Sequence, residues 1–103
     1  MSVAATNKFL EQLEAHEADL RRLGVRSLGL FGSCARSEEN TESDVDLLVE
    51  FEPEHKTLSN LVELGDFLET LFARRVELVT PEGLSPYIAP KILREVQYAR
   101  FAA

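Results

Sequence analysis

Two aspartates stand one residue apart at the beginning of a strongly apolar stretch of the sequence. Asp44 and Asp46 lie in SDVDLLVEF, residues 43–51, and no basic residue stands beside them. In an extended strand their side chains would share one face, with Cα atoms about 7 Å apart. Two carboxylates this close repel each other, and each pKa rises unless a cation compensates them. Mg²⁺ prefers carboxylate oxygens and keeps positions open for phosphate, so the spacing indicates a magnesium site.

A glycine–serine pair precedes the aspartates by about ten residues. Gly32 and Ser33 follow the apolar segment 25–31. Glycine lets a backbone approach a ligand closely, and a helix beginning at Ser33 would direct free N–H groups toward a phosphate. Arg36 either contacts the same phosphate or pairs with an acid such as Glu39. Together with the aspartates, this loop predicts a site for a metal-bound nucleoside triphosphate.

A third carboxylate follows in a later apolar segment. Glu77 lies within residues 76–80, flanked by valine and leucine. If that segment is a strand beside the one that carries Asp46, Glu77 would complete a two-metal site or serve as general base. The alternative is a surface acid that pairs with Arg75 or Arg36.

The helices and strands that position these side chains can be predicted from the spacing of apolar residues and from the glycines and prolines that end each element. The sequence predicts helices over about 6–23, 58–72 and 87–96, strands over 25–31, 44–51 and 76–80, and a short helix from Ser33 through Arg36 or Ser37. This order is typical of an α+β (α/β) domain, with a small mixed sheet of about three or four strands flanked by helices. We expect one domain, 1–103, with its core over about 25–96 and a C-terminal tail, 97–103, that either frays or docks.

The apolar positions predict which faces are buried. Alternation in the second strand places one apolar set on a single face, namely Val45, Leu47, Val49 and Phe51. The helix over 58–72 carries an apolar stripe made of Leu61, Leu64, Phe67, Leu68 and Leu71. We expect both sets to form the core, and the acids of the second strand to lie on the opposite face.

Composition narrows the class of protein. The chain has 103 residues and a formal net charge of −7, which argues against direct nucleic-acid binding through bulk electrostatics. No apolar run approaches the length of a membrane span, and the N-terminus lacks the features of a signal peptide. The single cysteine, Cys34, fits a reducing compartment. We therefore expect a cytoplasmic protein without membrane contact.

The stretch LFGSCARSEENTESDVDLLVEF resembles the signature of the minimal nucleotidyltransferase (MNT) family, within the DNA polymerase beta-like nucleotidyltransferase superfamily. Gly32 and Ser33 match its Gly-Ser pair, and Asp44 and Asp46 match its paired metal ligands. Glu77 falls where the family usually has a third aspartate. The resemblance runs from about Val25 to the last predicted helix.

Two positions depart from the family pattern. Ser37 stands where the family often has glycine after its Ala-Arg pair, and Glu77 replaces the third aspartate. The glutamate is longer by one methylene, which moves its oxygens by about a bond length in a site that needs close placement. Metal binding by Asp44 and Asp46 is independent of both changes.

The resemblance implies an activity and a partner. It implies transfer of a nucleoside monophosphate, AMP from ATP, to a hydroxyl of a protein, with one or two Mg²⁺ ions and with pyrophosphate leaving. It further implies catalytic and metal-binding roles for Asp44, Asp46 and Glu77. The nucleotide-binding residues would then be Gly32, Ser33 and Arg36. Small members of the family serve as antitoxins beside a HEPN-type toxin, and a hetero-oligomer with that toxin is expected.

Two alternatives stay open on the sequence alone. A non-catalytic antitoxin would mask its toxin and keep the site as a relic, which the two departures favour. The chain is also similar, more distantly, to aminoglycoside nucleotidyltransferases, although those are longer and have an additional domain for the drug. A chain of 103 residues has little room for an acceptor pocket, so a protein acceptor is the leading prediction.

Overall fold

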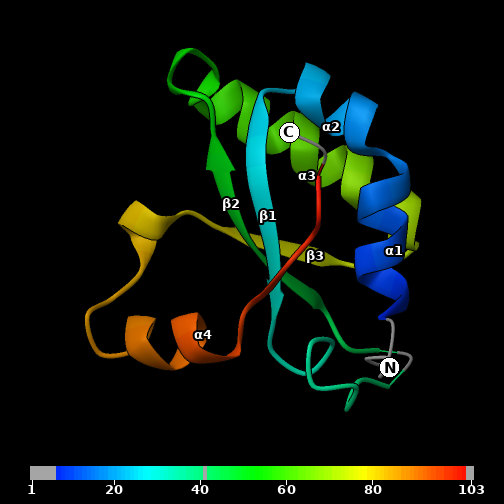
Figure 1. Cartoon of the computed structure of the whole chain (residues 1–103), viewed down its shortest axis with the longest axis vertical. Coiled ribbons are helices and arrows are strands. Elements are labelled where there is room, and N and C mark those ends of the chain that lie inside the picture. Colours follow the sequence, from blue (N-terminus) through cyan, green and yellow to red (C-terminus); the bar gives the residue numbers. More distant parts are fainter. Residues whose placement is uncertain (1–6, 41, 102–103) are drawn as a thin grey trace.

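The computed structural model describes residues 7–40 and 42–101, which form one sheet with helices on both of its faces (Figure 1). The elements in chain order are α1 (Lys8–Ala15), α2 (Glu17–Arg22), β1 (Val25–Phe31), β2 (Val45–Phe51), the 3₁₀ turn η1 (Pro53–His55), α3 (Leu58–Phe72), β3 (Val76–Val79), the 3₁₀ turn η2 (Pro81–Gly83), α4 (Ala89–Glu95) and β4 (Gln97–Tyr98). The predicted α+β class is confirmed.

The sheet is mixed and has four strands in the order β3-β2-β1-β4. β1 is antiparallel to both β2 and β4, whereas β2 and β3 are parallel. A parallel pair requires a long crossover between its strands, and α3 provides it. The register of the parallel pair decides which side chains of β2 and β3 lie next to each other.

The fourth strand comes from the segment predicted as a tail. Gln97 lies opposite Leu30 and Tyr98 opposite Gly29 in β1. The tail therefore docks on the sheet rather than fraying, and only residues 102 and 103 of it lie outside the described residues. Two residues give too little period-2 pattern for sequence alternation to identify them as a strand.

The helix predicted over 6–23 is instead two helices, because the chain bends at His16. Thr6, the predicted start, lies outside the described residues, and α1 begins after Asn7, whose side chain accepts hydrogen bonds from the first-turn N–H groups. The ring Nδ1 of His16 lies 2.9 Å from the carbonyl oxygen of Gln12, the group that the His16 N–H would use in a continuous helix. That N–H bonds to Leu13 instead, which tightens the chain into a turn.

The other predicted boundaries agree closely. The helix predicted over 58–72 is α3 with the same bounds, and the strands predicted over 44–51 and 76–80 are each one residue shorter. The last predicted helix, 87–96, is trimmed to Ala89–Glu95. End residues are the least certain part of any such prediction, because terminal turns have few hydrogen bonds to define them.

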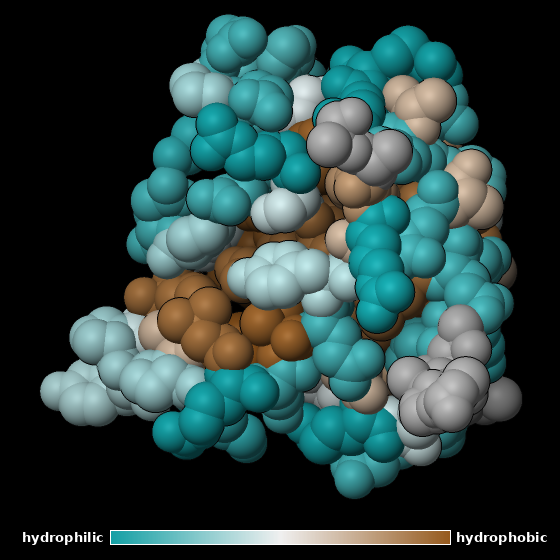
Figure 2. All heavy atoms as spheres, in the orientation of Figure 1, coloured by the Kyte–Doolittle hydropathy of each residue, from teal (hydrophilic) through white to brown (hydrophobic). Residues whose placement is uncertain are grey.

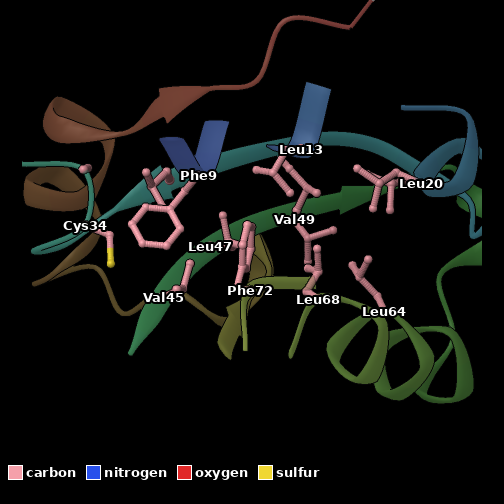
Figure 3. Packing of buried hydrophobic residues seen from close by; sticks show 14 of the residues in the cluster. Phe9, Leu13, Leu20, Cys34, Val45, Leu47, Val49, Leu64, Leu68 and Phe72 are labelled. Carbon is pink, nitrogen blue, oxygen red and sulfur yellow. The ribbon is translucent and has the colours of Figure 1, made fainter. Parts of the chain in front are cut away.

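The hydrophobic core lies between one face of the sheet and helices α1, α2 and α3 (Figure 3). The side chains that Figure 3 labels in it are Phe9, Leu13, Leu20, Cys34, Val45, Leu47, Val49, Leu64, Leu68 and Phe72. The predicted inward face of β2 and the predicted stripe of α3 are both confirmed, since their members are buried in this cluster or packed against it.

The opposite face of the sheet is only partly covered. On it, Ile92 of α4 packs against Phe31 and Leu48. Beside α4 lies an open groove of about 250 Å³, and Figure 2 shows apolar atoms gathered there. Its lining residues are Ser27, Leu48, Glu50, Pro81, Leu84, Ala89, Leu93 and Tyr98. Within residues 7–40 and 42–101, no helix combines the length and the hydropathy that crossing a membrane requires.

Burial on α3 yields a stability test with an internal control. Leu68 is fully buried and Leu58, on the same helix, is 76% exposed. We expect Leu68→Ala to lower the free energy of unfolding by about 2–5 kcal/mol, because it leaves a cavity. Leu58→Ala should change it by less than about 0.5 kcal/mol. Urea unfolding followed by circular dichroism measures both, and equal losses would contradict the assignment of the core.

Candidate active site

Residues 33–37 form a series of turns between β1 and β2, so the short helix predicted from Ser33 is wrong. The N–H groups of Ala35 and Arg36 both bond to the carbonyl of Gly32, at 3.1 and 3.2 Å. Ser37 then adopts a left-handed backbone with φ 59°, which stops helical geometry from continuing. The loop therefore offers separate N–H groups rather than the terminus of a helix.

The left-handed backbone of Ser37 explains one departure from the family pattern. A glycine adopts a positive φ without the steric cost that a Cβ brings, so this position favours glycine. Serine is tolerated here because residues on either side are held by other contacts, including the bond from the Glu38 N–H to the Ser33 carbonyl at 2.9 Å. The departure affects the strain of the loop, and it does not touch the carboxylates.

Gly32 lies directly against the carboxylate of Asp46. A Cβ added at Gly32 would overlap Oδ2 of Asp46, and the glycine has φ +78°. Two independent constraints therefore require glycine: the backbone conformation and the space above Asp46. Gly32 of the glycine–serine turn and Asp46, 14 positions apart in the sequence, are thus in contact.

Asp46 and Glu77 are neighbours across the parallel strands. They are register partners between β2 and β3, so their side chains leave the same face of the sheet. Burial, followed by the charges of Glu77 and Asp44, raises the pKa of Asp46 to about 6, while Arg36 acts in the opposite direction. The structure thus brings together the three acids that the sequence proposed.

Asp44 lies just ahead of β2, at the end of the loop, and its side chain is half-buried. Its carbonyl oxygen is 3.5 Å from the Sγ of Cys34, which is fully buried beneath the loop. Burial raises the pKa of that thiol, and Cys34 packs as a member of the hydrophobic core. Asp44 is close enough to Asp46 for its charge to raise the pKa of that carboxyl.

The donor chemistry of these acids fits a hard divalent cation. The half-buried Asp46 has acidic neighbours, with Arg36 opposing them, so the cluster carries negative charge that a cation would neutralise. No three Asp, Glu, His or Cys side chains in residues 7–40 and 42–101 already form a closed ligand set. Mg²⁺ does not need one, since it usually takes one or two carboxylates and completes its shell with water and phosphate.

The cationic side of the site is Arg36, whose acid partners differ from the predicted one. Its Nε donates to Glu38 at 3.0 Å and its Nη1 donates to Glu95 at 2.9 Å. Glu39, the partner named from the sequence, instead lies 3.9 Å from Lys8. Arg36 remains next to Gly32, because Glu95 also accepts the Gly32 N–H at 2.9 Å.

Three residues that the sequence reasoning missed hold the loop in place. Arg74 donates to the carbonyl oxygens of Asn40 and Ser43, and Asn7 donates to the carbonyl of Cys34. Glu95 of α4 is the third. All three act across sequence separations of 27 to 63 residues, so no local pattern could have identified them.

A family model described as "Nucleotidyltransferase domain" matches residues 7–99, nearly the whole chain. The chain belongs to the nucleotidyltransferase domain family. The resemblance found in the Gly-Ser and Asp-x-Asp motifs is confirmed by this match, which extends well beyond both motifs.

Relatives place the chain among minimal nucleotidyltransferases. It is 47% identical over 99 residues to "Protein adenylyltransferase MntA" of Thermococcus cleftensis, covering 95% of this chain and 99% of the relative. A structure described provisionally as a minimal nucleotidyltransferase has a TM-score of 0.72 and 37% identity, covering 92% of this chain and 98% of that one. A crystal structure of a toxin–antitoxin with AMP-PNP has a TM-score of 0.70 at 18% identity, covering 90% and 73%, which shows a shared fold.

Two glycines of this nucleotidyltransferase chain provide a matched test of the Gly32 contact. At Gly65 in α3 a Cβ would meet only Leu78 Cδ1, at an ordinary 3.7 Å. We expect Gly32→Ala to lower the free energy of unfolding by about 1–3 kcal/mol through backbone strain and overlap with Asp46. Gly65→Ala should raise it by up to about 1 kcal/mol, because alanine favours the helix. The same loss in both variants, in urea unfolding, would refute the contact.

The raised pKa of Asp46 makes the stability of the metal-free chain depend on pH. An acid whose pKa is higher in the folded than in the unfolded state lowers the free energy of unfolding at pH values above that pKa. The loss disappears at low pH, where the acid is protonated in both states. We expect Asp46→Asn to be more stable than the parent by about 1–2 kcal/mol at pH 7, after allowing for partial solvent screening. The gain should fade as pH drops from about 6 toward about 4.

Glu50→Gln is the control for this pH profile, because Glu50 lies on the same strand and is exposed. It removes an equal charge without relieving a crowded carboxylate. Thermal unfolding in the presence of a chelator, at several pH values, compares the two variants. A gain of equal size at pH 7 in both would attribute the effect to net charge rather than to the acid cluster.

Proposed function

We propose that this chain transfers AMP from ATP to a hydroxyl group of a protein partner and acts as the antitoxin of a HEPN-type toxin. The observation that supports this proposal most strongly is that Asp46 lies against Gly32 and is the register partner of Glu77. The chain is also a member of the nucleotidyltransferase domain family. The 47% identical relative is named a protein adenylyltransferase, which supports a protein acceptor.

The loop between β1 and β2 would hold the triphosphate. Gly32 offers a backbone N–H, Arg36 offers a planar set of charged donors, and Ser33 offers a hydroxyl at the start of the turns. Charge-assisted hydrogen bonds of this kind are the stronger ones in proteins. The loop lies against the acids, so a phosphate held here would be next to the oxygens that take a metal.

Asp44 and Asp46 would hold Mg²⁺, with Glu77 as a third ligand or as a base. When bound, the ion supplies positive charge that stabilises the triphosphate as charge develops on its oxygens. In the transfer, the acceptor oxygen forms a bond to the α-phosphorus while the bond to pyrophosphate breaks, and the hydroxyl proton passes to a base. Glu77 is exposed, which leaves its carboxylate open to an incoming acceptor.

The acceptor would come from a partner protein. The described residues bring one sheet face to the acids, and a partner would supply the acceptor hydroxyl from its own surface. A toxin–antitoxin crystal structure with the same fold, solved with AMP-PNP, supports this arrangement. We place the pair in the cytoplasm as one folded domain of this chain bound to its toxin.

The direct test is mass spectrometry of the co-purified partner after incubation with ATP and Mg²⁺. We expect added AMP on the partner, and labelling about 100-fold slower with the Asp44→Asn, Asp46→Asn double variant, because charge stabilisation at the transferred group is lost. The matched control is Glu50→Gln, Glu52→Gln, which removes two acids at the other end of β2 and should leave labelling unchanged.

Other outcomes of this experiment support other functions. If the partner gains no AMP yet is inhibited equally by the double variant, the chain is a masking antitoxin without catalysis. Transfer of AMP to an aminoglycoside in the absence of any protein partner would instead indicate small-molecule chemistry.

A further inference from the structure

The carboxylate of Glu95 accepts hydrogen bonds from two donors of the loop, the Gly32 N–H and the Arg36 guanidinium. Its Oε2 accepts the Gly32 N–H at 2.9 Å, and its Oε1 accepts Nη1 of Arg36 at 2.9 Å. Each oxygen takes one donor, which is the way a phosphate group would use the same pair. Glu95 reaches this position from the C-terminal end of α4, 63 positions along the chain from Gly32.

Glu95 is charged in this position under neutral conditions. The bond from the Gly32 N–H holds the pKa of its carboxyl below the ordinary value. Burial raises that pKa, and the hydrogen bond and charge of Arg36 lower it again. The side chain is partly buried, with 21% of its area exposed to solvent. An anion therefore already fills the donor pair when no nucleotide is bound.

A phosphate and Glu95 exclude each other at this pair. The Gly32 amide has one hydrogen, so it cannot serve both acceptors with good geometry. A second anion against the Glu95 carboxylate would also meet repulsion at contact distance, in a chain that is already acidic.

We infer that Glu95 is an internal competitor for the triphosphate, which must leave Gly32 and Arg36 before a nucleotide binds. The inference rests on the proposed function, because it takes Gly32 and Arg36 to be phosphate contacts. Glu95 then sets the affinity: the apparent dissociation constant equals the intrinsic one divided by the fraction of chains with Glu95 undocked. If it is docked in nine chains of ten, binding is weakened about tenfold.

Neighbouring contacts restrict how Glu95 leaves. Ile92, three residues earlier in α4, is buried against Phe31 and Leu48, and the Gln97 side chain donates to the Ala35 carbonyl at 3.1 Å. These contacts anchor the chain on both sides of Glu95. Rotation of the Glu95 side chain alone is therefore the simplest route, and it leaves the backbone of α4 in place.

The test compares three variants by calorimetric titration with Mg²⁺ and a non-hydrolysable ATP analogue. Glu95→Gln keeps the shape of the side chain but removes its charge, and Glu95→Asp keeps the charge but shortens the reach. Glu38→Gln is the matched control, because Glu38 also pairs with Arg36 but has no bond to Gly32. We expect Glu95→Gln to bind about tenfold more tightly, Glu95→Asp to bind more tightly than the parent, and Glu38→Gln to change less than about threefold.

The results separate this inference from the proposed function. Saturable binding to the parent with no gain, or a loss, in Glu95→Gln overturns the competitor and makes Glu95 a residue that positions Arg36. A gain of equal size in Glu38→Gln overturns it as well, since charge alone then explains the effect. No binding by the parent or by any variant overturns both the inference and the proposed function. Circular dichroism of each variant checks that the fold is kept.

Discussion

The carboxylate of Asp46 lies half-buried beside Glu77 and Asp44, with Arg36 the opposing charge, and its raised pKa records how poorly this charge is balanced. A fold maintains such a cluster only when the backbone determines it from several directions. Here the parallel register fixes Glu77, and the bare α-carbon of Gly32 leaves room for the Asp46 oxygens. The unbalanced charge makes this corner of the sheet attractive to a cation, and the rest of the fold holds the acids in place.

The two faces of the sheet differ in what they carry: one holds the main hydrophobic core and the other holds the acidic side chains. One face is covered by α1, α2 and α3 and carries the main core, whereas the other carries the acids, a short helix and an open apolar groove. Because side chains of β2 alternate, each residue that contributes to the core has a neighbour on the other face. A small protein can therefore keep a charged cluster without placing it in its core, where an uncompensated charge would be costly.

The sequence predicted what local periodicity and short motifs encode. Alternation in β2 and the stripe of α3 identified the buried face, and the Gly-Ser and Asp-x-Asp spacing identified the acids and the loop. The breaks were missed where a single residue leaves helical geometry, as at His16 and Ser37. The contacts of Glu95 and Arg74 with the loop join segments far apart in the chain, so they depend on the folded topology and could not be read from either segment alone.

The burial of Cys34 has a practical consequence for studying the loop. It is the single cysteine of the chain, it is wholly inaccessible, and burial disfavours its reactive thiolate. A maleimide or a disulfide reagent can therefore modify the folded chain only when the segment above the sulfur lifts away, and every adduct reports that one position. The rate of thiol labelling therefore measures how often the loop opens, and the measurement needs no introduced cysteine.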